Sequence, residues 1–221
     1  MPYRITPLVN DEYYHIYNRG VAKQPIFFSK RDYERFMLCL NFYRFQDLPS
    51  RLSKVLQLPY DLRKSLLDSI ESNPKAVQII AYCLMPNHFH LLIRQNVDHG
   101  ISSYLRKISD SYTKYINTKS ERVGPLFQGT FKAVHVSSDE QLMHLSRYIH
   151  LNPLVSFVVR EEDFLNYSWS SLKNYLNKGS KLVDAEPISG YFSSPKKYLE
   201  FVMDRAEYGK ELERIKHLVL E

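Results

Sequence analysis

The chain has 221 residues, 44% hydrophobic and 24% charged, with a formal net charge of +6 that favours a polyanionic partner. This length predicts one domain with extensions, or two small domains, and can bury roughly 70% of the unfolded surface. No apolar run reaches the roughly 20 residues that span a bilayer, and the N-terminus has no apolar signal-peptide core, so we expect a cytoplasmic protein that does not enter the membrane.

The first predicted element is a strand over residues 12–20, in which polar and apolar side chains alternate. His15 and Tyr17 share one face of this strand, and Arg19 follows on the same face. Such a face is either the wall of a site or an ordinary solvent-facing surface, and the pattern alone does not choose between them.

An amphipathic helix is predicted next, from Ser29 to about Phe45. Prolines interrupt the pattern between residues 47 and 75, where only a short helix over 62–70 is expected. This segment is too short to form its own core, so we interpret it as an insertion. The two cysteines lie in apolar segments without metal-ligand spacing, which predicts reduced core thiols.

Two strands are then predicted over residues 76–85 and 88–95, joined by a tight Pro-Asn turn. His88 and His90 begin the second strand and point to the same face, because side chains alternate along a strand. Neutral imidazole is a common ligand of divalent metals, so this pair is a candidate metal site. Two half-buried structural histidines are the alternative reading of so short a motif.

A helix over residues 101–118 carries its tyrosines on the apolar stripe, which predicts core positions for them. Arg106 and Lys114 lie off that stripe. A fourth strand is predicted over 131–136, with Lys132 near its start.

Another helix begins after Ser138, which forms a capping-box pattern with Gln141. Tyr148 and Asn152 lie one turn apart on one face of this helix, and Pro153 is expected to end it. Taken alone, Tyr148 reads as a boundary residue and Asn152 as a helix cap.

Several of these segments resemble the single-tyrosine transposases of small insertion sequences, a group of the HUH endonucleases. Residues 84–92 contain the His-hydrophobic-His motif in a similar setting. Residues 147–153 resemble the tyrosine helix of the REP-associated tyrosine transposases. Shorter resemblances to the same group lie at residues 14–20, 126–129 and 167–171.

The resemblance implies a mixed α/β (α+β) fold, namely a ferredoxin-like HUH domain with an antiparallel sheet and helices on one face. That domain would span residues 1–155 and carry the insertion at about 47–75. A helical C-terminal extension over 156–221 would pack on it, with helices over 167–176 and from Ser194 and a charged helical tail.

The implied activity is that of a DNA transposase, a metal-dependent single-strand DNA endonuclease and strand transferase. Tyr148 would attack a phosphodiester, leaving a 5′-phosphotyrosyl link and a free 3′-OH. His88 and His90 would bind Mg²⁺ or Mn²⁺. Asn152 matches the third-ligand position, where the transposases proper carry glutamine and the REP-associated group carries asparagine.

The implied partners are single-stranded DNA that contains a hairpin and a second copy of the chain in a homodimer. We expect five basic or imidazole side chains to contact the DNA, although ordinary surface is the alternative for each: His15, Arg19, Arg106, Lys114 and Lys132.

Two other functions are compatible with the sequence. One is a domesticated DNA or RNA hairpin binder that no longer cuts, although a binder has no need of His88, His90 and Tyr148 together. The other is a metal-dependent phosphodiester hydrolase that uses water, which would form no covalent protein–DNA product.

Overall fold

The computed structural model describes residues 7–177 and 181–211 and is built on one four-stranded antiparallel sheet, in the order β2-β3-β1-β4. The strands are β1 (Tyr13–Arg19), β2 (Val77–Met85), β3 (His88–Gln95) and β4 (Lys132–Val136). The α-helices are α1 (Lys30–Tyr43), α2 (Leu52–Val55), α3 (Tyr60–Ile70), α4 (Gly100–Lys119), α5 (Asp139–Val155), α6 (Glu161–Phe164), α7 (Leu172–Leu176), α8 (Glu186–Ser189) and α9 (Pro195–Met203), and a 3₁₀ helix, η1, spans Val21–Lys23.

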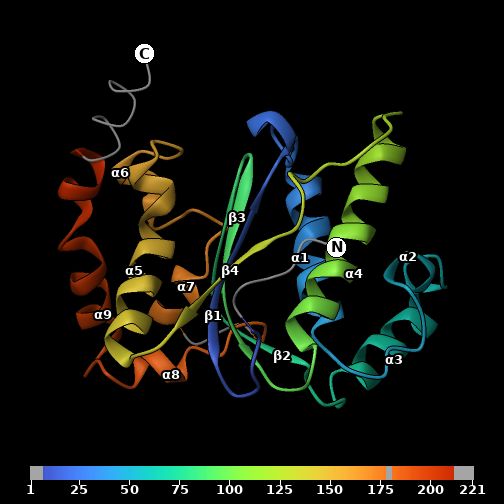
Figure 1. Cartoon of the computed structure of the whole chain (residues 1–221), viewed down its shortest axis with the longest axis horizontal. Helices are drawn as coiled ribbons and strands as arrows, with labels where there is room; N and C mark the ends of the chain where they lie inside the picture. The colour runs from blue at the N-terminus through green and yellow to red at the C-terminus, as the bar shows by residue number, and fades with distance from the viewer. Residues whose placement is uncertain (1–6, 178–180, 212–221) are drawn as a thin grey trace.

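The order β1-α1-β2-β3-α4-β4 is that of a ferredoxin-like fold, so the predicted fold class and antiparallel sheet are confirmed. Helices α1 and α4 pack together on one face of the sheet (Figure 1). The predicted insertion contains α2 and α3, which lie at the outer end of the α1–α4 layer (Figure 1). No helix in the described part of the chain is both long and apolar enough to cross a bilayer.

Helices cover both faces of the sheet, whereas the sequence analysis expected them on one face only. Helix α5 packs against β2 and β3 on the face opposite α1 and α4, and α9 packs behind α5 (Figure 1). The reason lies in β2, which is apolar on both sides, and in the apolar residues of β3 beside it. Phe89 and Leu91 enter the core beneath α1 and α4, while Leu92 enters the core beneath α5. A strand with two apolar faces needs a layer on each.

The tyrosines of α4 are core residues, as predicted. Tyr104 and Tyr112 are buried, and each hydroxyl donates a hydrogen bond to a backbone carbonyl, of Leu40 at 3.0 Å and of Ile26 at 2.7 Å. A buried phenol is tolerated when its hydroxyl is paired in this way. The two cysteines are likewise buried and unbridged, as expected.

Helix α5 begins as the capping pattern predicts, because Ser138 Oγ accepts a hydrogen bond from Gln141 N at 3.2 Å. The expectation that Pro153 ends the helix is wrong, since α5 continues to Val155. Pro153 removes one N–H bond and crowds the carbonyl four residues back, but only two residues of α5 follow it, and Ser156 N still donates to Asn152 O at 3.0 Å.

The predicted helix over residues 167–176 is helical only from Leu172. The residues before it bond instead along the outer edge of β2: Leu84 N donates to Trp169 O at 2.8 Å, and Ser171 N donates to Tyr82 O at 3.0 Å. An open strand edge thus takes priority over local helix propensity. The predicted helix after Ser194 is present as α9, whereas the last ten residues of the expected tail lie outside the described residues.

A buried polar network fixes α5 against the C-terminal helices. His150 Nδ1 lies 2.6 Å from Tyr198 Oη, and His150 Nε2 lies 2.7 Å from Ser171 Oγ. The Tyr198 hydroxyl donates to Ser146 Oγ at 3.0 Å, so α5 is held at two positions on its inner side. Burial lowers the pKa of His150 to about 3, which keeps its imidazole neutral.

This burial predicts that stability falls in mild acid. Below its ordinary pKa of about 6.5 the unfolded chain protonates His150 while the folded chain does not, so stability is lost as the pH falls from 6.5 toward 3. Between pH 7 and pH 5 this single group should cost about 2 kcal/mol of unfolding free energy. Denaturant titrations at both pH values should show His150→Gln losing less than wild type by about that amount.

His144→Gln makes the same change on the exposed side of the same helix and is the matched control for the substitution itself. Equal pH dependence in wild type and His150→Gln would show that His150 is protonated in the folded protein.

Candidate active site

The two motif histidines open β3 on the face of the sheet that α5 covers. Register places Tyr17 of β1 opposite His90, and Arg19 opposite His88. Lys132 of β4 lies opposite Tyr17 on the other side of β1. Directly paired residues of antiparallel strands share a face, so the backbone brings these five side chains to one surface.

Helix α5 adds Tyr148 to this surface. Its ring stands edge-on to His90, with ring centroids 5.5 Å apart, and edge-on to His15, with centroids 6.0 Å apart. Tyr148 is still 49% exposed. A phenol that touches the histidines and yet reaches solvent can meet a large substrate such as DNA.

Each motif histidine has its Nδ1 engaged. His90 Nδ1 lies 2.9 Å from His15 Nε2, and His88 Nδ1 lies 2.6 Å from Asn87 Oδ1. The Asn87 amide is oriented by its Nδ2, which donates to Lys23 O at 3.1 Å. Because Asn87 Oδ1 can only accept, Nδ1 of His88 is the donor in this contact.

Burial keeps the central imidazoles neutral. It holds the pKa of His90 well below its usual value, and the neighbouring His88 and His15 lower it further. Burial also lowers the pKa of His15 to about 4. A neutral imidazole retains the lone pair that a metal ion requires.

The fit to a divalent metal rests on His88 and His90. Within the described ranges, no three or more His, Cys, Asp or Glu side chains are grouped to hold a metal. Any further protein ligand must therefore be an amide or another neutral oxygen. Asn152 is buried on α5, and its Nδ2 donates to Tyr148 O at 3.0 Å, so its amide nitrogen is committed to the helix.

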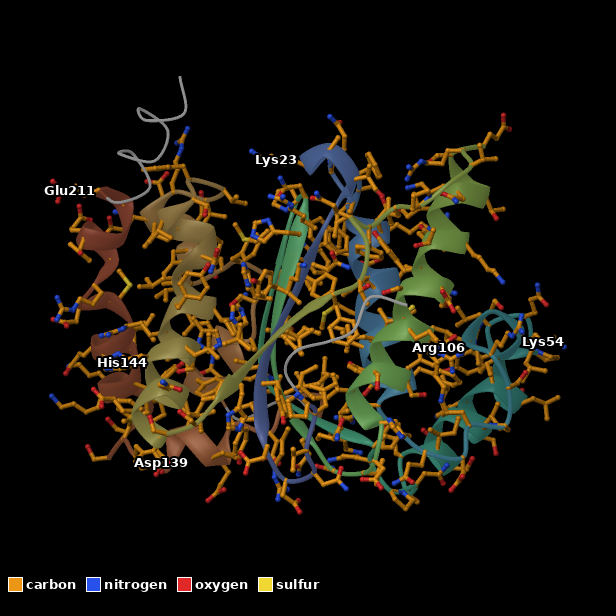
Figure 2. All side chains as sticks on the ribbon, viewed as in Figure 1. Lys23, Lys54, Arg106, Asp139, His144 and Glu211 are labelled. Carbon is orange, nitrogen blue, oxygen red and sulfur yellow. The ribbon has the colours of Figure 1, made fainter. Side chains whose placement is uncertain are left out.

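The structure separates the predicted DNA contacts into two groups. Arg19 and Lys132 are exposed on the strands of the site, and Arg19 Nε donates to Gln128 Oε1 at 2.5 Å. Arg106 and Lys114 are exposed on α4, a helix that lies across the sheet from α5 (Figure 1). Figure 2 labels Arg106 on this helix. They are not brought to the histidines, and their contact with DNA stays a prediction.

Two neighbours of the site were missed as site residues. Tyr17 packs its ring against His15 at 5.1 Å and His90 at 5.9 Å. The spacing could have predicted this, because Tyr17 lies two residues after His15 and both side chains point to the same face of the strand. Asn87 was read only as a turn residue, and its contact with the adjacent histidine has no signature in the sequence.

Comparisons with known proteins agree with this geometry. The family model described as "Transposase IS200 like" matches residues 56–152, which include both histidines, Tyr148 and Asn152. A solved structure described as a REP-associated tyrosine transposase bound to a REP hairpin matches with a TM-score of 0.57 and 13% identity, over 88% of this chain and 96% of that chain. A sequence comparison with curated proteins gives no match.

The resemblance expected from the sequence is thus confirmed, and at this identity the structural match shows the fold. The family match begins at residue 56, inside the predicted insertion at 47–75, and the domain boundaries stay a prediction.

The neutral site predicts flat imidazole titrations. Between pH 8 and pH 5.5 the NMR signals of the His15 and His90 rings should hardly move, because burial keeps the pKa of His15 near 4 and that of His90 well below 6.5. A titration midpoint near 6.5 for either ring would contradict the buried, neutral site.

Proposed function

We propose that the chain is a transposase-type single-strand DNA endonuclease and strand transferase that cuts with Tyr148 and a divalent metal. The observation that carries this proposal is the contact of a half-exposed tyrosine with neutral His90, next to His88 on the same strand face. These residues all lie in the segment matched to the IS200-like transposases. The exposure of Tyr148 leaves its hydroxyl accessible to a DNA strand.

Tyr148 would act as the nucleophile. Its Oη forms a bond to the scissile phosphorus and loses its proton to solvent, while the bond from phosphorus to the 3′ oxygen breaks. That oxygen leaves as a 3′-OH, and the 5′-phosphate stays on Tyr148. A 3′-OH can then attack the phosphotyrosine, so the strand is resealed and the phenol is released. One phosphodiester is exchanged for another, so no nucleotide cofactor is required.

Mg²⁺ or Mn²⁺ would supply charge withdrawal from the scissile phosphate. His88 and His90 would hold the ion through Nε2, because Nδ1 of each is engaged by Asn87 and His15. We propose the Asn152 Oδ1 as the third ligand, since its Nδ2 is fixed on the Tyr148 carbonyl. Two imidazoles with an amide oxygen suit Mn²⁺ at least as well as Mg²⁺.

The DNA would lie over the exposed end of this face, where Arg19 and Lys132 meet the phosphates. The matched structure is described as holding a REP hairpin, and we propose that this chain too binds a hairpin with an adjoining single strand. Tyr148 contacts His90 of its own chain, which supports cleavage within one subunit. A homodimer would then pair two complete sites.

Covalent capture tests the proposed chemistry. Purified protein with Mn²⁺ and end-labelled hairpin DNA from the flanks of its own gene should give a protein–DNA adduct on a denaturing gel. Tyr148→Phe should abolish the adduct, because it removes the attacking oxygen and leaves the ring contacts with His90 and His15.

Tyr208→Phe, an exposed tyrosine on the C-terminal part of the chain, is the control and should form the adduct normally. Cut DNA that carries no protein and that persists in Tyr148→Phe would show hydrolysis by water. Binding of the hairpin with neither cleavage nor adduct would identify a protein that binds DNA hairpins without cutting them.

The proposed phosphate contacts of Arg19 and Lys132 give a separate prediction. The double variant Arg19→Ala/Lys132→Ala should weaken single-strand binding and reduce the slope of log affinity against log salt by about 1 to 2, because each phosphate contact releases counterions. Fluorescence anisotropy over a series of salt concentrations measures both quantities.

Lys54→Ala/Lys64→Ala removes the same charge from exposed positions on α2 and α3, which lie across the sheet from α5 (Figure 1), and should leave the slope unchanged. Equal losses of DNA affinity in the two double variants would mean that the net charge of the protein, and not contact with Arg19 and Lys132, governs binding.

A further inference from the structure

We infer that His15 is a positioning residue that holds His90 in the one tautomer able to bind a metal through Nε2, and that it does so instead of contacting DNA. The metal-binding purpose of this hydrogen bond rests on the proposed function. The hydrogen bond itself can be tested without it.

His15 is packed inside the site. Its ring stacks on the ring of His90, with centroids 5.1 Å apart and planes 25° apart, and its other neighbours are Tyr17 and Tyr148. The ring is only partly exposed, and its Nε2 is occupied by His90 at 2.9 Å. Little of the side chain is therefore left to contact a phosphate, whereas a phosphate-binding residue is expected to be exposed.

The hydrogen bond between the two rings can be made in two ways. Either His90 Nδ1–H donates to His15 Nε2, or His15 Nε2–H donates to His90 Nδ1. The second arrangement places the proton of neutral His90 on Nε2 and closes that atom to a metal. Only the first leaves a lone pair on His90 Nε2, and it requires His15 to be the acceptor.

The neighbouring histidine supports the first arrangement. Asn87 Oδ1, oriented through Lys23 O, can only accept the proton of His88 Nδ1. With His15 as acceptor, both motif histidines carry their protons on Nδ1 and present Nε2. An acceptor behind a ligand histidine is the usual means of fixing its tautomer and its ring orientation.

His15 also contacts both His90 and Tyr148, since the centroids of the His15 and Tyr148 rings lie 6.0 Å apart in an edge arrangement. One side chain thus sets the orientation of a proposed ligand and packs against the proposed nucleophile. Two substitutions separate these roles. His15→Phe keeps an aromatic ring and loses the acceptor, whereas His15→Gln keeps an acceptor oxygen and loses the ring.

The first test uses tautomer-sensitive ¹H–¹⁵N NMR of the histidine rings in metal-free protein near neutral pH. In wild type, His90 should show the protonated-Nδ1 form. His15→Phe should convert His90 to a mixture of tautomers, and His15→Gln should restore the Nδ1 form. His135→Phe makes the same change on β4, at a position paired with Tyr14 on the opposite face, and should leave His90 unchanged.

The second test is Mn²⁺ affinity, measured by calorimetry on the same four proteins. His15→Phe should weaken binding by roughly 10- to 100-fold, the usual cost of losing such an acceptor. His15→Gln should recover most of that loss, and His135→Phe should bind as wild type does. A purely structural role for His15 would give the opposite order, because phenylalanine preserves the ring packing better than glutamine does.

A protonated Nε2 on His90 in wild type would overturn the inference, and so would unchanged Mn²⁺ affinity in His15→Phe. Failure of the proposed function looks different: wild type would then bind no Mn²⁺ and form no DNA adduct, while the His90 tautomer would still respond to His15→Phe.

Discussion

The site exists because a helix from the second half of the chain lies flat on the histidine face of the sheet. Without α5 the face of β1 and β3 would offer imidazoles, basic side chains and Tyr17, but not Tyr148. The hydrophobic residues of α5 supply most of the energy of this docking, since each buried Leu or Ile contributes about 1.5–3 kcal/mol. Hydrophobic burial has no direction, however, and does not by itself decide which side of the helix faces the histidines.

The direction comes from hydrogen bonds. His150 and Ser146 point inward and are paired with Tyr198 and Ser171, so a rotation of α5 would leave several buried polar atoms unpaired. Each such loss costs about 1–3 kcal/mol. Tyr148, two residues before His150, is thereby turned to the edge of the site. The C-terminal helices thus act on the site through α5, although they lie behind it (Figure 1).

A second set of hydrogen bonds prepares the histidines. Burial lowers the pKa of His90 but does not decide which of its two ring nitrogens carries the proton. The contact with Asn87 makes Nδ1 of His88 the donor, and His15, as the proposed acceptor, would do the same for His90. Preorganisation of this kind lowers the cost of binding a small, strongly hydrated cation with only a few protein ligands.

The sequence predicted the elements that follow from periodicity, among them β3 and α4. The family resemblance singled out His88, His90 and Tyr148, whose rings the structure brings together and whose roles stay predictions. It failed where tertiary contacts override local preference. Residues 169–171 pair with the edge of β2 instead of forming a helix, α5 passes through Pro153, and a second helical layer covers the sheet. Asn87 and the role of His15 were out of reach, because a hydrogen bond between rings on different strands depends on register that no local pattern encodes.

The central claim is that His88 and His90 present Nε2 to one metal ion beside Tyr148. Anomalous diffraction from a crystal soaked in Mn²⁺ tests it most directly. The account predicts one strong peak within coordination distance of both Nε2 atoms, with His15 and Asn87 still bonded to the two Nδ1 atoms. A peak on Nδ1 of either histidine, or no manganese between them at saturating Mn²⁺, would contradict it.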